Sequence, residues 1–301
     1  MRNAASLVWQ KLFEQQEYAF ITGDLGFMAL EPVRDKLGKW FINGGISEQN
    51  IVSMAAGMSK MGVQTWVYSI APFIYARPFE QIRNDVCLNQ LPVRLVGNGG
   101  GYAYGSMGSS HHAIEDYGAM LTLQGMQVYV PAFAEDVEDA VWCMAKREQP
   151  AYLRLGRCEK PKDFVLPAYA PWRQLIEGDR HIIVVVGPLA GGFIAPLLAL
   201  PREQRPALWV LSELPYGFEH LPPLLLQGLA NQRELVVVEE HVAHGSAGHH
   251  LLASLHQRGI APAGFRHFCA QGYPSAYYGS QVFHRAESSI DAISVLRALQ
   301  E

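Results

Sequence analysis

Residues 41–62, FINGGISEQNIVSMAAGMSKMG, decide the fold and mark where the chemistry lies. A short apolar run ends at Gly44-Gly45, and a helix rich in small residues and methionine is predicted from Glu48. Alone, Glu48 would be interpreted as a capping residue, because the helix dipole favours a carboxylate in the first turn. Since this helix has few surface charges, we expect it to be buried, with Glu48 at the lip of a desolvated site.

Around this segment, β-branched runs alternate with segments of helical period. In the first half, strands are predicted at 19–22, 40–42, 65–68, 93–96, 127–130 and 151–155, and helices at 48–61, 78–89, 114–124 and 134–148. In the second half, strands are predicted at 182–186, 208–211 and 234–239, and helices at 221–230, 249–258 and 289–300. This alternation implies crossover connections and mostly parallel sheets. We predict an α/β protein with two parallel or mixed-sheet domains, 1–160 and 181–301, joined by a surface linker at 161–180.

Composition narrows the class of protein. The 301 residues are 49% hydrophobic and 17% charged, which excludes disorder, and leave room for two domains. The net charge is −4 with no basic block, so we expect neither a nucleic-acid nor an anionic-membrane partner. Four scattered cysteines are typical of a reducing cytoplasm. The uncharged run 182–200 approaches the length of a membrane span, but its Gly and Pro residues favour a strand, a turn and a helix.

A glycine-rich loop follows the strand at 93–96. Its six glycines between Gly97 and His112 allow the backbone to approach a ligand closely. It contains neither a dinucleotide nor a nucleoside-triphosphate fingerprint. The loop ends in His111-His112, at the carboxyl end of a strand, where open α/β sheets bind ligands. Surface, structural and site roles for these histidines all stay open.

A second histidine-rich segment follows Glu239-Glu240. It contains His241, His244, His249 and His250, but the spacing matches no zinc signature. We therefore expect no metal ligands in this chain, and favour a helix N-terminal turn at a contact between the domains.

The segments quoted above carry a family resemblance. GISEQN within 41–62 resembles the pyrimidine-binding domain of thiamine-diphosphate enzymes of the transketolase group. TGDLG at 22–26, SIAPFIYARPFEQIRNDV at 69–86 and the loop ending in SHHAIE are similar to further segments of that domain. VVVEEHVAHGSAGHH at 236–250 resembles the C-terminal domain of the same group.

The resemblance implies a role for each matched residue. Glu48 would contact the aminopyrimidine ring of thiamine diphosphate and stabilise its imino tautomer. Phe73, or alternatively Tyr75, would stack on that ring, and Asp24 would lie near the thiazolium. These roles follow from the family and not from the spacing of the residues.

The same resemblance implies how a substrate would be held. His111, with His112 beside it, would hydrogen-bond the substrate, and Arg157 would bind the phosphate of a sugar. A linker ion pair is the alternative role for Arg157. Two positions depart from the transketolase pattern: Met107 replaces an aspartate and Gly99 replaces a histidine that touch the donor sugar. The donor is therefore expected to be an unusual ketose.

The half of these enzymes that binds the diphosphate and Mg²⁺ has no counterpart in the sequence. Its GDG…N motif is missing, since Leu25 follows Gly23-Asp24. The resemblance therefore implies a partner, an N-terminal transketolase-like subunit carrying the diphosphate and Mg²⁺ site, with two copies of each chain in an α2β2 assembly. The expected function is transfer of a two-carbon ketol unit from a ketose, phosphorylated or otherwise modified, to an aldose.

Three alternatives remain open at this point. The chain is also similar to the β-subunit of 2-oxo acid dehydrogenases and to 1-deoxyxylulose-5-phosphate synthase. Asp24 and the SHHAIE segment favour transketolase over both. A third alternative is an inactive relative that scaffolds or regulates a partner, which the presence of Glu48 and the aromatic segment disfavours.

Overall fold

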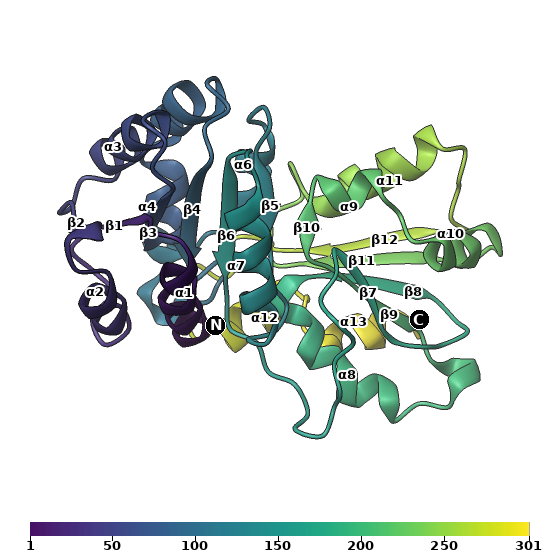
Figure 1. Cartoon of the computed structure of the whole chain (residues 1–301). Coiled ribbons are helices and arrows are strands. Elements are labelled where there is room, and N and C mark those ends of the chain that lie inside the picture. The colour runs from purple at the N-terminus through teal and green to yellow at the C-terminus, as the bar shows by residue number, and fades with distance from the viewer. Residues whose placement is uncertain (301) are drawn as a thin grey trace.

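A computed structural model describes residues 1–300 of the chain and contains two sheets (Figure 1). The first sheet has seven strands in the order β10-β5-β6-β4-β3-β1-β2. Its strands are β1 (Ala19–Thr22), β2 (Phe41–Asn43), β3 (Thr65–Ile70), β4 (Val93–Asn98), β5 (Gln127–Tyr129), β6 (Ala151–Leu155) and β10 (Glu213–Leu214). All pairings among β1 to β6 are parallel, as the alternation of strands and helices predicts.

The second sheet has five strands in the order β12-β11-β8-β9-β7. They are β7 (Trp172–Ile176), β8 (Ile182–Val186), β9 (Ala207–Leu211), β11 (Leu235–Glu239) and β12 (Phe265–Cys269). Only β7 is antiparallel to its neighbour, β9. The α/β class with two parallel or mixed sheets is therefore confirmed.

Helices cover both faces of the first sheet. They are α1 (Arg2–Gln15), α2 (Glu31–Leu37), α3 (Glu48–Lys60), α4 (Ala71–Ala76), α5 (Phe79–Gln81), α6 (Asp116–Leu121) and α7 (Asp136–Lys146). On one face, Trp9 of α1 and Val141 of α7 pack in one cluster with Phe20 and Trp66 of the strands. On the other face, Ile51 of α3 packs with strand residues of a second cluster. Two-sided coverage explains why every residue of β1, β4 and β6 except Asn98 is buried.

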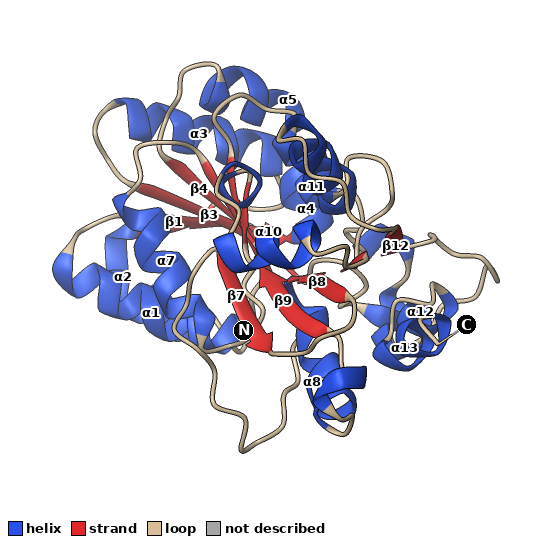
Figure 2. Ribbon diagram, turned by 90° about the vertical axis from the view of Figure 1, so that its right-hand side faces the viewer, coloured by secondary structure: helices blue, strands red, loops and turns tan. Residues whose placement is uncertain are grey.

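Helices cover the second sheet in the same way. They are α8 (Ala190–Leu198), α9 (Tyr216–Glu219), α10 (Pro223–Ala230), α11 (Ala247–Gln257), α12 (Gln281–Glu287) and α13 (Ala292–Ala298). Figures 1 and 2 show α8 and α10 on opposite sides of this sheet. The alternation of side chains along β8 explains this, because Ile183 packs in the cluster that contains Phe193 of α8 and Val184 in the cluster that contains Leu225 of α10.

The uncharged run 182–200 folds as a strand, a turn and a helix. It divides into β8, a 3₁₀ turn at Gly187–Leu189 and α8. Across residues 1–300, no helix has the length and apolar character needed to cross a membrane.

Two connections differ from the sequence prediction. The predicted linker 161–180 contains β7, an edge strand of the second sheet. This strand was not predicted, because it contains polar residues. One of them, Arg173, is nevertheless buried, since it pairs with buried Asp136 of α7, with Nη2 2.5 Å from Oδ2. The predicted helix at 78–89 is α5 followed by a π-helix at Ile82–Cys87.

The second half also completes the first sheet. Strand β10 pairs antiparallel with β5, matching Glu213 to Tyr129 and Leu214 to Val128. Apolar residues of both halves also join one continuous core cluster, which includes Val128 and Leu211. The two sheets are thus held together by backbone pairing as well as by apolar packing.

Candidate functional site

The carboxyl edge of the first sheet gathers most of the predicted site residues. Asp24 follows β1, Glu48 follows β2, Phe73 follows β3, His111 lies in the loop after β4, and Arg157 follows β6. Parallel strands end at one edge, which is where open α/β sheets bind ligands. The edge is divided into a cluster around Glu48 and two cavities.

Glu48 is buried at the first residue of α3, with 4% of its surface exposed. The Arg77 guanidinium donates a hydrogen bond from Nη1 to Glu48 Oε2 at 2.8 Å. Ser69 Oγ, at the end of β3, lies 3.4 Å from Oε1. A buried carboxylate is costly without a counter-ion, and Arg77 supplies that counter-ion to Glu48.

Phe73 connects Glu48 to His111. The Arg77 guanidinium carbon lies 3.8 Å from the centre of the Phe73 ring, a stacked cation–π contact. The His111 ring lies against Phe73, with centroids 5.3 Å apart and planes at 63°. His111 Nδ1 is 2.9 Å from Ser110 Oγ, and Nε2 makes no hydrogen bond to any described residue. We call Glu48, Ser69, Phe73, Arg77 and His111 the sheet-edge cluster.

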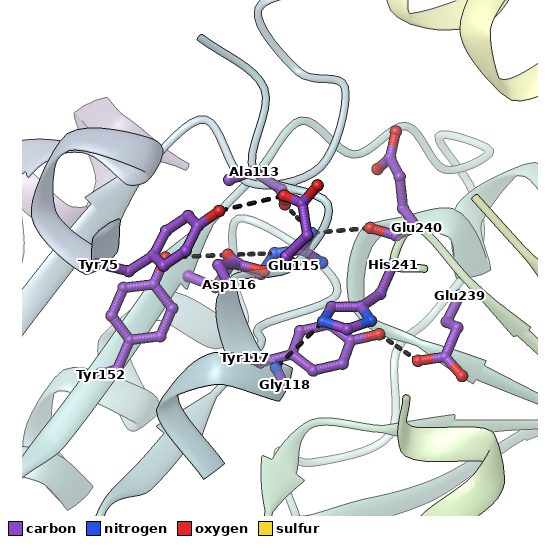
Figure 3. A network of polar contacts seen from close by, with 12 residues as sticks. Tyr75, Ala113, Glu115, Asp116, Tyr117, Gly118, Tyr152, Glu239, Glu240 and His241 are labelled. Carbon is purple, nitrogen blue, oxygen red and sulfur yellow. Dashed lines mark hydrogen bonds and ion pairs between the residues drawn. The ribbon is translucent and has the colours of Figure 1, made fainter. Parts of the chain in front are cut away.

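The alternative stacking residue, Tyr75, lies away from this cluster. Its hydroxyl donates to Glu115 Oε2 at 3.1 Å (Figure 3). Burial and the nearby Glu115 raise the Tyr75 pKa well above its usual range. Between the two aromatic candidates, Phe73 is the one in contact with the ion-pair partner of Glu48.

His112 lies apart from His111, facing the second half of the chain. It is 3% exposed, and its Nε2 donates to the carbonyl of Gly105 at 2.8 Å. Its Nδ1 therefore accepts from the Tyr273 hydroxyl, 3.0 Å away. Burial lowers the His112 pKa, which keeps this arrangement neutral. These contacts make His112 a residue that holds the loop against the second half, so a substrate-binding role for it has no geometric support.

Asp24 lines a cavity of about 420 Å³ beyond the ends of β1 and β2. The side chain is exposed and accepts a hydrogen bond from Asn43 Nδ2 at 3.1 Å. Glu31 and Arg34 of α2 also line this cavity. Glu48 is not among its lining residues, so the two carboxylates face different spaces in this chain.

Arg157 lines a second, polar cavity of about 340 Å³. Arg2, Asn98 and Tyr104 line it as well. Neither Arg2 nor Arg157 makes a side-chain hydrogen bond or ion pair with a described residue, so the linker ion pair considered for Arg157 is not formed within residues 1–300. Two unpaired guanidinium groups on one cavity suit an anion such as phosphate.

The structure explains the glycine at position 99. Gly99 has φ +80°, and a Cβ there would lie 2.1 Å from Cε2 of Tyr104. The Tyr104 ring fills this space, its hydroxyl accepts from Asn98 Nδ2 at 2.9 Å, and its ring centroid lies 5.8 Å from that of His111. Tyr104 thus separates the polar cavity from the sheet-edge cluster, while Met107, the other departure, is 56% exposed.

A larger set of polar residues lies between the two halves (Figure 3). We call it the buried network, and it comprises Asp116, Tyr117, Tyr152, Arg154, Glu239, Glu240, His241, His267 and Arg285. Arg154 Nε lies 2.8 Å from Asp116 Oδ2, and both side chains are at most 3% exposed. The same guanidinium donates to the backbone carbonyl of Glu240 at 2.9 Å, so it joins the halves.

The histidine-rich segment belongs to this network. Glu239 accepts from Tyr117, His267 and the amides of Ala247 and Gly248. Burial raises the Glu239 pKa, but the hydrogen bonds from His267 and Tyr117 outweigh it, so the pKa lies below its ordinary value. The carboxylate is therefore charged and fully used in holding the N-terminus of α11.

His241 forms the predicted contact between domains. The Gly118 amide of α6 donates to His241 Nε2 at 3.1 Å, and a Cβ at Gly118 would lie 2.7 Å from the ring. Within residues 1–300, no group of three or more His, Cys, Asp or Glu side chains is arranged to hold a metal ion.

The sequence prediction missed three residues at this edge: Arg77, Tyr104 and Arg2. Arg77 stands four positions after Phe73, the spacing at which two helical side chains meet, so this pairing could have been found. The position of Tyr104 depends on the fold of the glycine loop, and that of Arg2 on where α1 packs.

The sheet-edge cluster fits an aminopyrimidine ring. Glu48 offers a buried carboxylate, and Phe73 offers a flat apolar face already covered by a planar nitrogen-rich group. The cluster therefore suits the pyrimidine part of thiamine diphosphate.

Comparisons with known proteins agree with this geometry. Residues 1–161 match the family model described as "Transketolase, pyrimidine binding domain". The chain is 28% identical over 241 residues to one subunit of the apulose-4-phosphate transketolase of Phocaeicola vulgatus, covering 76% of this chain and 74% of that protein. It is 28% identical over 273 residues to the 1-deoxy-D-xylulose-5-phosphate synthase of Magnetococcus marinus, covering 87% of this chain but 42% of the synthase.

A solved structure is similar over nearly the whole chain. It is described as a split gene transketolase, an inactive beta4 tetramer, and superposes with a TM-score of 0.82 at 27% identity. The alignment covers 99% of this chain and 96% of that one. The similarity therefore extends through both sheets and their mutual arrangement.

Proposed function

The chain belongs to the transketolase pyrimidine-binding domain family, and on that basis we propose that it is one subunit of a split, thiamine-diphosphate-dependent transketolase. The observation that carries this proposal is the sheet-edge cluster, in which buried Glu48 and the face of Phe73 are joined by one planar group. An aminopyrimidine ring, with a nitrogen at its edge and a flat face, fits Glu48 and Phe73 in the same way.

Each residue of the cluster has a distinct task in this proposal. When bound, thiamine diphosphate supplies the carbanion chemistry that transfers a ketol unit. Glu48 holds a proton at the ring nitrogen N1′, and Phe73 supports the face of the ring. His111 directs its free Nε2 toward the substrate, because its Nδ1 is engaged by Ser110. The apolar contact with Phe73 keeps the imidazole in this orientation.

The polar cavity supports a phosphorylated substrate. Arg157 and Arg2 line it, and the Tyr104 ring lies between this cavity and His111. A phosphate held by the two guanidinium groups would place the rest of a short sugar chain across Tyr104, toward the cluster.

A simple substrate comparison tests this assignment. We expect Arg157→Met and Arg2→Met each to lower kcat/KM about 10-fold for a phosphorylated ketose, the loss of one charge-assisted contact, and to spare its unphosphorylated analogue. Arg297→Met on α13, exposed and distant from this edge, is the control. Equal losses for both substrates would contradict a phosphate site.

The proposal includes a partner subunit that carries the diphosphate and Mg²⁺ site. Apolar side chains stand exposed at the sheet edge beside the Asp24 cavity: Phe27 is 81%, Met28 78% and Ile46 81% exposed. A surface of this kind suits contact with another protein. Two copies of each chain would close the assembly, and Asp24 would then face the thiazolium side of the shared site.

The similarity to 1-deoxy-D-xylulose-5-phosphate synthase supports a second candidate. A synthase-like subunit would consume pyruvate and release carbon dioxide, whereas a transketolase cleaves a ketose. The same measurements separate a transketolase from two other candidates. The β-subunit of a 2-oxo acid dehydrogenase would also release carbon dioxide, and an inactive scaffold would turn over neither substrate.

Reconstitution tests the proposal. We expect the isolated chain to be inactive, and activity to appear on mixing with the partner subunit, thiamine diphosphate and Mg²⁺. Glu48→Gln should reduce the reconstituted rate about 100-fold or more, because a positioned acid–base group is removed. Exposed Glu80 of α5 provides the matched control, Glu80→Gln. Turnover by the isolated chain would contradict the split architecture.

A further inference from the structure

Arg77 occupies the space between the two groups assigned to the pyrimidine ring. Its Nη1 is 2.8 Å from Glu48 Oε2, and its guanidinium carbon is 3.8 Å from the centre of Phe73. Because one guanidinium makes both contacts, it covers the face of Phe73 that looks toward Glu48. The guanidinium is flat and meets Glu48 with its edge, as an aminopyrimidine would through a ring nitrogen that shares a proton with the carboxyl group.

We propose that Arg77 is an internal ligand of the pyrimidine subsite and must swing out before the cofactor's ring can enter. The inference rests on the proposed function, because it takes Glu48 and Phe73 to be the partners of that ring. Both ligands need the same carboxylate oxygen and the same face of Phe73. Binding of one therefore excludes the other.

The surroundings of Arg77 allow this movement. The side chain is 42% exposed, whereas that of Glu48 is 5% exposed, so Arg77 can leave toward solvent. Within residues 1–300 its guanidinium donates a hydrogen bond only to Glu48. It follows the six-residue helix α4, which also carries Phe73, so Phe73 can stay in place when the Arg77 side chain turns.

The contact also has a role when the cofactor is absent. Glu48 lies at the first residue of α3, where an unpaired buried carboxylate would be costly. Arg77 supplies the counter-ion until a ligand replaces it. The apparent affinity for a pyrimidine is then lowered by the fraction of molecules in which Arg77 occupies the subsite.

Binding of a small neutral probe measures this competition. The probe is 4-amino-5-hydroxymethyl-2-methylpyrimidine, the pyrimidine half of thiamine, titrated calorimetrically into the full chain at pH 8. We expect Arg77→Met to bind it about 10-fold more tightly than the wild type, which corresponds to an occupied state about 10 times as populated as the open one. Arg83→Met is the control, because Arg83 is exposed and, among residues 1–300, its side chain hydrogen-bonds only to its neighbour Asn84.

Ionic strength supplies an independent readout. Salt screens the half-exposed Arg77–Glu48 pair but not the uncharged probe. Probe affinity of the wild type should therefore rise with salt, while that of Arg77→Met stays constant. Thermal unfolding of each variant verifies that it is folded at the titration temperature.

The outcomes separate the two claims. Probe binding by the wild type that is unchanged or weakened in Arg77→Met, with no rise with salt, overturns the inference and leaves the proposed function standing. Absence of binding by the wild type and by folded Arg77→Met overturns both, because the subsite then does not accept a pyrimidine. Tighter binding by Arg77→Met, with no change in Arg83→Met, supports the inference.

Discussion

The sheet-edge cluster and the buried network are built from the same kinds of side chain but differ in how their polar groups are used. In the buried network, Arg154 and Glu239 direct their polar atoms at partners within the chain. In the sheet-edge cluster, Glu48 is held by one half-exposed arginine, and one nitrogen of His111 has no partner among the described residues. Closed hydrogen bonding indicates a structural role, and open hydrogen bonding indicates a place for a ligand.

Breaking the central ion pair of the buried network should give the largest effect. Arg154→Met leaves fully buried Asp116 without its counter-ion, so we expect a loss of about 3–5 kcal/mol in the free energy of unfolding, measured with urea. Arg202→Met removes exposed ion pairs with Glu177 and Asp179 and should cost at most about 1 kcal/mol. Equal costs for the two variants would break the comparison.

Replacing each of the adjacent histidines in turn tests the same contrast between an open site and a structural network. His111→Gln is expected to lower the reconstituted rate about 100-fold, because the group proposed to orient the substrate is lost, with unfolding unchanged within about 0.5 kcal/mol. His112→Gln should instead lower stability by about 1–3 kcal/mol, since its hydrogen bonds to Gly105 and Tyr273 are disturbed. If His112→Gln lowered the rate and His111→Gln lowered stability, the proposed assignment of the two histidines would be wrong.

Position 99 tests the wall between the polar cavity and the cluster. Gly99→Ala should cost about 1–3 kcal/mol, because φ is +80° and the Tyr104 ring fills the space. Gly57→Ala in α3, where a Cβ meets nothing within 4 Å, is the control and should be neutral or stabilising. If adding Tyr104→Ala to Gly99→Ala recovers none of the loss, the ring is not the obstacle.

Mild acid should weaken the contact between the halves. Burial lowers the pKa values of His112, His241 and His284 below the ordinary 6.5, so they stay neutral in the folded chain and gain protons on unfolding. Stability is then fully present above about pH 6.5 and falls as the pH drops. Each histidine contributes up to about 1.4 kcal/mol per pH unit, measured by urea unfolding between pH 7 and 5. A flat profile would show that these rings take up protons while the chain is folded.

Much of the fold could be predicted from the sequence because buried parallel strands consist largely of β-branched and other apolar residues. The predicted strand 19–22 coincides with β1, and 182–186 coincides with β8. Strand β7 escaped because edge strands tolerate polar residues, here Arg173 and Gln174, and β10 because it has only two residues.

The candidate site was predicted in part for a similar reason. The composition of its helix marked Glu48, whereas Phe73 was chosen from the family resemblance, and the structure connects the two through Arg77. The different surroundings of His111 and His112 could not be predicted, because adjacent residues in a loop face whichever side the turn imposes. Tyr104 and Arg2 gain their places from the packing of distant segments, which no local pattern records.

The short strand β10 has a practical consequence for anyone who divides this protein. The family match ends at residue 161, but the edge of β5 is covered by Glu213 and Leu214, which come later in the chain. A fragment ending at 161 would expose the backbone amides and carbonyls of β5 to other molecules, and such open edges recruit further strands and aggregate. The unit recognised by its sequence is therefore smaller than the unit in which the edge of β5 is paired.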